Sequence, residues 1–188
     1  MIKRRDIILS ASAATLPCLV TAAPVSIDHS GKVYPVDQGS ADLCWLASAA
    51  MLMSAARGVP VTMQQLAGEL GGMWKAMYDA KSFITADRVE PFAKALKVRT
   101  DGLKSMTPDA WAKRLAPGPV LLLGYTPQAR MGHAVVLAGL TGDTADFKGM
   151  TAKVVDPNGG TNSTTSFPTL IKFYEGAASA GVPQLMFV

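Results

Sequence analysis

Histidine and cysteine are both scarce in this sequence, which holds two of each among 188 residues. Such a set, without ligand-like spacing, does not suit a zinc site. Charged residues make up only 17%, and no run of lysine or arginine remains after the first few positions. Gly159-Gly160 lacks the lysine and the spacing of a phosphate-binding loop. We therefore expect no metal, no cofactor and no nucleic-acid partner.

The first 23 residues have the composition of an export signal. Lys3-Arg4-Arg5 begins it, a mostly apolar stretch runs from Ile7 to Val20, and Val20-Thr21-Ala22 offers small residues for cleavage. The apolar stretch is shorter than the roughly 20 residues that a membrane-spanning helix needs. The arginine pair resembles a twin-arginine signal, with the general secretory route as the alternative. We expect residues 1–23 to be removed and the protein to be periplasmic or secreted, without stable membrane insertion.

The remaining residues, 24–188, read as one domain. Removing residues 1–23 takes away three basic residues and one acidic residue, so the net charge falls from +4 to about +2. Hydrophobic residues make up 49% of the chain, enough for a sizeable core. The patterns predict helices over 42–57, 62–70, 87–96 and 107–115, then strands over 119–125, 133–140, 152–155 and 184–188. Helices followed by strands indicate an α+β fold.

Local signals mark the ends of these helices. The segment 42–57 is apolar almost all round, which predicts a buried helix, with Ser40 or Asp42 as its cap and Gly58 at its end. A capping box begins at Thr62, and Thr107 before a proline is a strong helix start. We expect 26–36 to be extended and 73–80 to be a short helix or a loop.

Cys44 is the candidate nucleophile. Removal of the export signal takes Cys18 with it and leaves Cys44 as an unpaired thiol. A lone cysteine often serves as a small buried hydrophobe. Cys44, however, falls in the first turn of a predicted buried helix. Unpaired N–H groups and the positive end of the helix dipole stabilise a thiolate there.

Three later polar residues suit the roles of base and orienting group. Of the two histidines in 24–188, His29 lies in a polar segment and is expected to be exposed, whereas His133 stands at the entry to a strand. Asp156 ends the next predicted strand. Adjacent strands would bring its carboxylate to the imidazole and hold the tautomer, with Asn158 as an alternative.

Gln38 precedes Cys44 by six residues and can direct its amide N–H at a substrate oxygen, beside the backbone N–H of Cys44. Gln38-Gly39-Ser40, three further residues and Cys44-Trp45 resemble the active-site segment of papain-like cysteine peptidases. Gly132-His133-Ala134-Val135 and Asp156-Pro157 resemble the histidine and acid segments of the bacterial members, which include secreted effector and leader-processing peptidases.

This resemblance implies a helical lobe with a buried catalytic helix, followed by an antiparallel sheet lobe. It also implies roles: Gln38 as oxyanion donor, Cys44 as nucleophile, His133 as base and Asp156 as its partner, acting on a protein or peptide. The chain departs from plant papains, which carry a second cysteine just before the nucleophile where this chain has Ala41-Asp42. Most papains also have asparagine where Asp156 stands.

Two other classes of function remain open from the sequence. The same acyl-enzyme chemistry serves cell-wall amidases or endopeptidases, transglutaminases and deamidases. A non-catalytic binding domain could keep the fold without the reaction. The spacing of Gln38 favours a peptidase, and the intact set of four polar residues argues against a binding domain.

Overall fold

The computed structural model describes residues 24–102, 104–126, 131–177 and 184–188, so the predicted export signal lies outside it. The helices are α1 (Cys44–Arg57), α2 (Met63–Leu70), α3 (Gly72–Asp79), α4 (Ala86–Leu96), α5 (Pro108–Leu115) and α6 (Phe167–Gly176). The strands are β1 (Pro24–Asp28), β2 (Arg99–Asp101), β3 (Val120–Thr126), β4 (Met131–Asp143), β5 (Thr151–Asp156), β6 (Thr161–Ser166) and β7 (Leu185–Phe187). Within these ranges, no helix has both the length and the apolar character to cross a membrane.

The strands form one antiparallel sheet in the order β2-β7-β3-β4-β5-β6, with β1 also pairing with β4. Strand β4 is long enough to pair with both β3 and β1: its first half pairs with β3 and its second half with β1. The α+β prediction, with a helical part before an antiparallel sheet, is confirmed.

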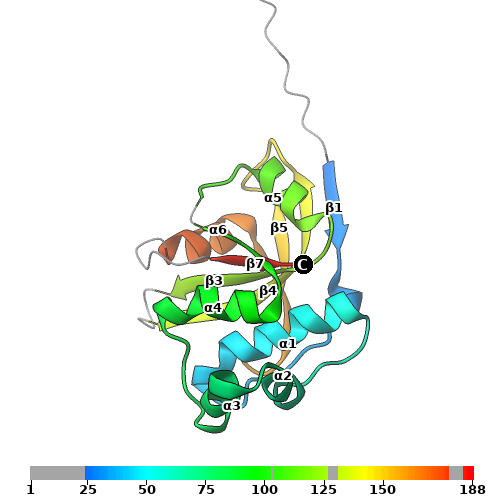
Figure 1. Ribbon diagram of the computed structural model, residues 1–188. Helices are drawn as coiled ribbons and strands as arrows, with labels where there is room; N and C mark the ends of the chain where they lie inside the picture. Colours follow the sequence, from blue (N-terminus) through cyan, green and yellow to red (C-terminus); the bar gives the residue numbers. More distant parts are fainter. Residues whose placement is uncertain (1–23, 103, 127–130, 178–183) are drawn as a thin grey trace, which may run out of the picture.

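Helices cover the sheet on both faces, because alternate side chains of a strand point to opposite sides. On β3, Leu121 packs into a cluster with α1 and α4, whereas Leu122 packs with α5 and α6. Figure 1 shows α1, α2 and α3 grouped together below the strands, with α6 beside β3 and α5 near β1 and β5. The layers leave the first residue of α1 close to the beginning of β4.

The burial of α1 agrees with its apolar composition. Trp45 is 2% exposed and packs edge-on against Phe92 at 4.8 Å between ring centroids. Gly58 ends the helix in the left-handed region, at φ 69°. The predicted cap is wrong: a short 3-10 turn precedes α1, Leu43 is the N-cap, and no side chain caps the helix.

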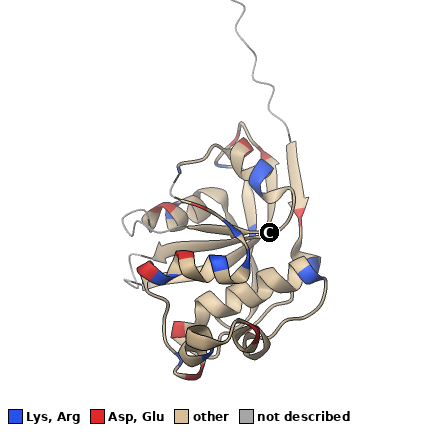
Figure 2. Cartoon of the chain, viewed as in Figure 1, with Lys and Arg blue, Asp and Glu red and all other residues tan. Residues whose placement is uncertain are grey.

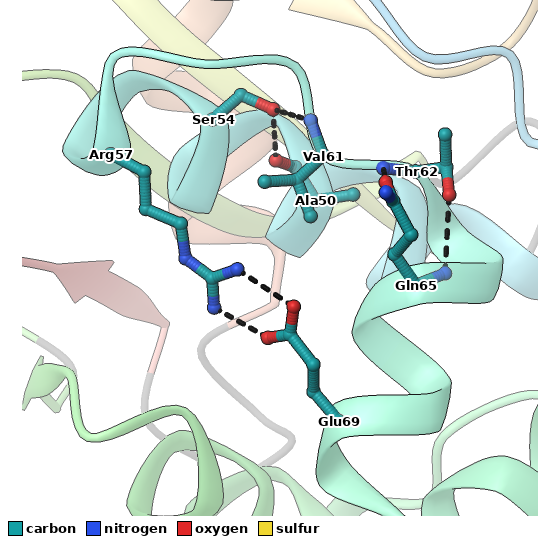
Figure 3. A network of polar contacts seen from close by, with 7 residues as sticks. All are labelled: Ala50, Ser54, Arg57, Val61, Thr62, Gln65 and Glu69. Atoms are coloured by element: carbon teal, nitrogen blue, oxygen red, sulfur yellow. Dashed lines mark hydrogen bonds and ion pairs between the residues drawn. The ribbon is translucent and has the colours of Figure 1, made fainter.

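Local sequence signals located α2 and α5 correctly. Thr62 makes both bonds of the capping box with Gln65, and the side chain of Thr107 accepts a hydrogen bond from the backbone N–H of Ala110. Figure 3 shows this box beside the corner where α1 turns into α2. At that corner Ser54 Oγ donates to the Ala50 carbonyl and accepts from the buried backbone N–H of residue 61.

The sequence did not predict β1, β2, β6 or α6. The lead-in expected to be extended over 26–36 forms strand only to Asp28 and then a 3-10 turn over Ser30–Lys32. Two glycines, which have no side chain, allow α6 and β1 to pack closely against the sheet. A Cβ at Gly124 would overlap the Phe173 ring on α6, and one at Gly139 would lie 2.7 Å from the Ile27 carbonyl on β1.

Candidate active site

Cys44 is the first residue of α1, is partly exposed and is a free thiol. The next residue holds this helix end in place. Trp45 donates from Nε1 to the Ser82 carbonyl at 3.1 Å and packs against Trp74 and Phe92. The start of α1 is therefore rigidly placed, and the backbone N–H groups of its first turn lie next to the thiol.

A buried serine joins α1 to the strand that carries His133. Ser48 is fully buried one turn after Cys44, and its Oγ donates to the Ala134 carbonyl at 2.9 Å. Because residues four apart share a helix face, Cys44 and Ser48 face the same strand. This bond is made to the residue that follows His133. It therefore fixes the position of the Cys44 thiol relative to the part of β4 that carries His133.

His133 and Asp156 meet across neighbouring strands. His133 Nε2 lies 2.8 Å from Asp156 Oδ1, and the same oxygen accepts the backbone N–H of Asn158 at 2.8 Å. The Asn158 side chain is exposed and makes no hydrogen bond to the ring among the described residues. With Nε2 engaged by Asp156, Nδ1 is the ring nitrogen left for a second partner.

The pKa of His133 is strongly raised. Burial, the largest single influence, lowers it, but hydrogen bonding to Asp156 and Cys44, and the charges of both, outweigh burial and raise the pKa to about 9. For Asp156, burial acts to raise the pKa, and the hydrogen bonds from His133 and from the Asn158 N–H lower it below its ordinary value. An imidazolium beside a carboxylate is therefore the favoured state at neutral pH.

Gln38 is 7% exposed and lies against the turn that follows Asp156. Its backbone N–H donates to the Pro157 carbonyl at 2.8 Å. Gly160, in the same turn, has φ +60°, and a Cβ there would lie 3.2 Å from the backbone nitrogen of Asp37. One turn thus contacts both the histidine's partner and the loop that carries Gln38, whose Oε1 is buried without a partner among the described residues.

Three cavities have His133 in their walls, and two of them include Cys44 or the loop of Gln38. The first, of about 520 Å³, is mostly apolar and includes Cys44, His133, Trp45 and Phe83 in its wall. The second, of about 630 Å³, is lined by His133, the loop of Gln38 and the turn after Asp156. An extended chain crossing His133 would therefore have an apolar recess on one side and a polar wall on the other.

His29 lies elsewhere, and the expectation that it is exposed is wrong. It is half-buried, and its Nε2 is 2.9 Å from the Leu115 carbonyl at the end of α5. The long separation of these two residues in the chain hid this contact from sequence reasoning. Across the described ranges, no three His, Cys, Asp or Glu side chains gather as metal ligands would.

Residues 28–175 match the family model described as papain-like cysteine protease AvrRpt2. No curated protein matches the chain. The match spans most of the sequence and agrees with the helical part followed by an antiparallel sheet, so the molecule is a papain-like peptidase of the cysteine type. Within that class, the chain belongs to the AvrRpt2 family, peptidase family C70.

Proposed function

We propose that this protein is an exported peptidase that cleaves peptide bonds through Cys44, His133 and Asp156, with Gln38 as an oxyanion donor. One observation carries the proposal: His133, whose Nε2 lies 2.8 Å from Asp156 Oδ1, lines the same cavity as the thiol at the start of α1. The raised pKa of His133 supports an imidazole that takes the proton of the Cys44 thiol before attack and holds it until the amine departs.

The reaction then proceeds in two steps. The Cys44 thiolate attacks the scissile carbonyl carbon, and the oxyanion takes hydrogen bonds from the Gln38 amide and the Cys44 N–H. The C–N bond breaks as His133 gives its proton to the departing amine, which leaves a thioester on Cys44. Water attacks the thioester, His133 takes the water's proton, and the acid product departs as the thiolate returns.

The apolar cavity supports a substrate with a large apolar side chain near the cleaved bond. Its wall carries Trp45, Phe83, Ile84 and Val89, all on the helical side of Cys44. Burying one such side chain contributes about 1.5–3 kcal/mol. Export is part of the proposal because residues 1–23 have the composition of an export signal, with basic residues followed by an apolar stretch.

The decisive experiment is labelling with an epoxysuccinyl thiol probe under reducing conditions, followed by peptide mapping. The wild type should be labelled at Cys44, and Cys44→Ala should take up no label and cleave no peptide. Cys44→Ser serves as a shape-matched control for folding. No labelling of folded wild-type protein would refute the proposal, and labelling with release of cell-wall peptide fragments but no protein cleavage would favour an amidase instead.

A further inference from the structure

A separate cavity, of about 340 Å³, lies at the opposite end of α1 from Cys44. Leu52, Ala55 and Ala56 contribute to its wall, and Ala55 lies about 17 Å along the helix from Cys44 at 1.5 Å per residue. The segment after α5, Phe187 on β7 and Val188 also contribute to the wall. No residue of this wall lines the cavities at His133.

Four basic side chains line this cavity, and no acidic side chain does: Lys32, Arg99, Lys113 and Arg114. They come from three segments that are far apart in the sequence, the turn after β1, the start of β2 and the end of α5. Figure 2 shows blue ribbon on α5 and again close to the marked C-terminal end. Cations gathered in a hollow with low-dielectric walls repel one another and attract anions from solution.

The two arginines are held in place and the two lysines are not. Arg114 pairs with Asp101, and Arg99 donates to the main-chain oxygen of Val188 at 3.0 Å. Both guanidinium groups also lie over the Phe187 ring, at 4.0 and 4.8 Å from its centroid. Lys32 and Lys113 form no ion pair with an Asp or Glu side chain among the described residues, so no carboxylate side chain there neutralises their charges.

The helix dipole explains only part of this arrangement. Lys113 and Arg114 lie in the last turn of α5, where cations are favoured by the carbonyl ends. Lys32 and Arg99 do not belong to α5, yet they line the same hollow. A recess of this size with fixed guanidinium groups suits phosphate oxygens, which accept charge-assisted hydrogen bonds from arginine and lysine.

We propose that this cavity binds a small phosphate-bearing anion of the diphosphate type, at a site distinct from the peptidase centre. Lys32 and Lys113 supply the free charge, and Arg99 and Arg114 supply a fixed rim. The anion relieves the mutual repulsion of these side chains, so it stabilises the folded protein when it binds.

The test is titration of the full-length protein with inorganic pyrophosphate at constant ionic strength, followed by calorimetry and by ³¹P NMR. The double variant Lys32→Gln/Lys113→Gln should bind about tenfold or more weakly than the wild type, because it loses two charge-assisted contacts. The matched control is Lys94→Gln/Lys148→Gln, which removes the same charge outside the cavity and should bind as the wild type does. Cys44→Ala should also bind normally, which separates this site from catalysis.

Two results would overturn the proposal. One is equal weakening in both double variants, which would mean that net charge alone attracts the anion. The other is the absence of saturable binding to wild-type protein at millimolar pyrophosphate. Circular dichroism spectra identical to those of the wild type establish that the lysine variants are folded.

Discussion

One carboxylate oxygen, Asp156 Oδ1, accepts hydrogen bonds from both His133 Nε2 and the Asn158 N–H. The backbone bond holds the carboxylate at the end of β5, and the ring bond holds the imidazole. Sequence reasoning brought His133 and Asp156 together because the start of one antiparallel strand lies opposite the end of the next. It preferred Asp156 and kept Asn158 as an alternative, since the sequence of the turn does not show which of the two side chains faces the imidazole.

Asp156→Asn should move the alkaline limb of the activity profile towards neutral pH. Asparagine keeps a hydrogen-bond acceptor for Nε2 but loses the negative charge. Without that charge the imidazolium is less stabilised against the effect of burial, so the pKa of His133 falls from about 9. The measurement is kcat/KM against pH. Asn158→Ala is the control, because its backbone N–H remains, and it should leave the limb in place. A shift as large in Asn158→Ala would assign the orienting role to Asn158 instead.

Gly160→Ala should lower turnover through the loop of Gln38. The new Cβ would lie 3.2 Å from the backbone nitrogen of Asp37, whereas a Cβ at Gly159 meets only Thr161 Cγ2, at 3.7 Å. Both glycines have positive φ, so both alanine variants should lose about 1 kcal/mol of stability. Only Gly160→Ala should lower kcat, measured at saturating peptide. Equal kcat in the two variants would contradict this positioning role.

At the scale of elements, α1 is attached to its surroundings by a buried serine near each end. Ser48 bonds to β4 beside His133, and Ser54 accepts the N–H at the α1–α2 corner (Figure 3). The apolar composition of the helix predicts its burial but not these contacts, because each depends on a backbone group supplied by another segment.

Ser48→Ala and Ser54→Ala form a matched pair. Each leaves a buried backbone group without its partner, so each should reduce the free energy of unfolding by about 1–3 kcal/mol in urea titrations. Ser48→Ala should in addition lower kcat, because Cys44 and His133 lose the bond that fixes their separation. If Ser54→Ala lowered kcat as much at a temperature where both variants are folded, the effect would be general loosening of the helix.

Predictability differed among elements for physical reasons. Thr62 and Thr107 each cap the helix that begins directly after them. Both helix starts can therefore be predicted from the local sequence without knowledge of the fold. The missed strand β6 reads Thr-Asn-Ser-Thr-Thr-Ser and shows no apolar alternation, because it is mostly exposed at the end of the sheet. The missed α6 had a usable signal, Ser166 as cap before a proline in the first turn.

For the whole molecule, His133 links stability to pH. Its folded-state pKa of about 9 lies above the ordinary 6.5, so its contribution is complete below pH 6.5 and is lost as the pH rises through 9. The loss amounts to at most about 3 kcal/mol at 1.36 kcal/mol per pKa unit. Asp156 acts on the acid side, where its contribution is lost as the pH falls below its ordinary 3.8.

Thermal unfolding from pH 4 to 10 should therefore give a flat Tm up to about pH 6.5 and a decline towards pH 9. His133→Gln cannot gain a proton and should show little of that decline. A decline of the same size in His133→Gln would place its origin in other groups.

The anion cavity is a property of the whole fold. Its four basic residues stand apart in the sequence as ordinary surface charges, and only the packing of α1, α5, β2, β7 and the turn after β1 brings them together. No window along the chain contains the pattern, so reasoning from local sequence could not find it.

The order of strands has one more consequence, for association between molecules. Edge strands expose unpaired N–H and C=O groups that can template intermolecular sheets. Here one end of the strand order is β2, only three residues long with Arg99 and Asp101 in it, and the other is β6, built from Thr, Asn and Ser. A third edge strand, β1, pairs only with β4 among the described strands, and its exposed residues are Pro24, Ser26 and Asp28. None of the three offers an apolar surface on which a second copy could stack. The strongly β-prone segments of β3 and β4 stay in the interior of the sheet, which protects a concentrated solution of the folded protein against fibril growth.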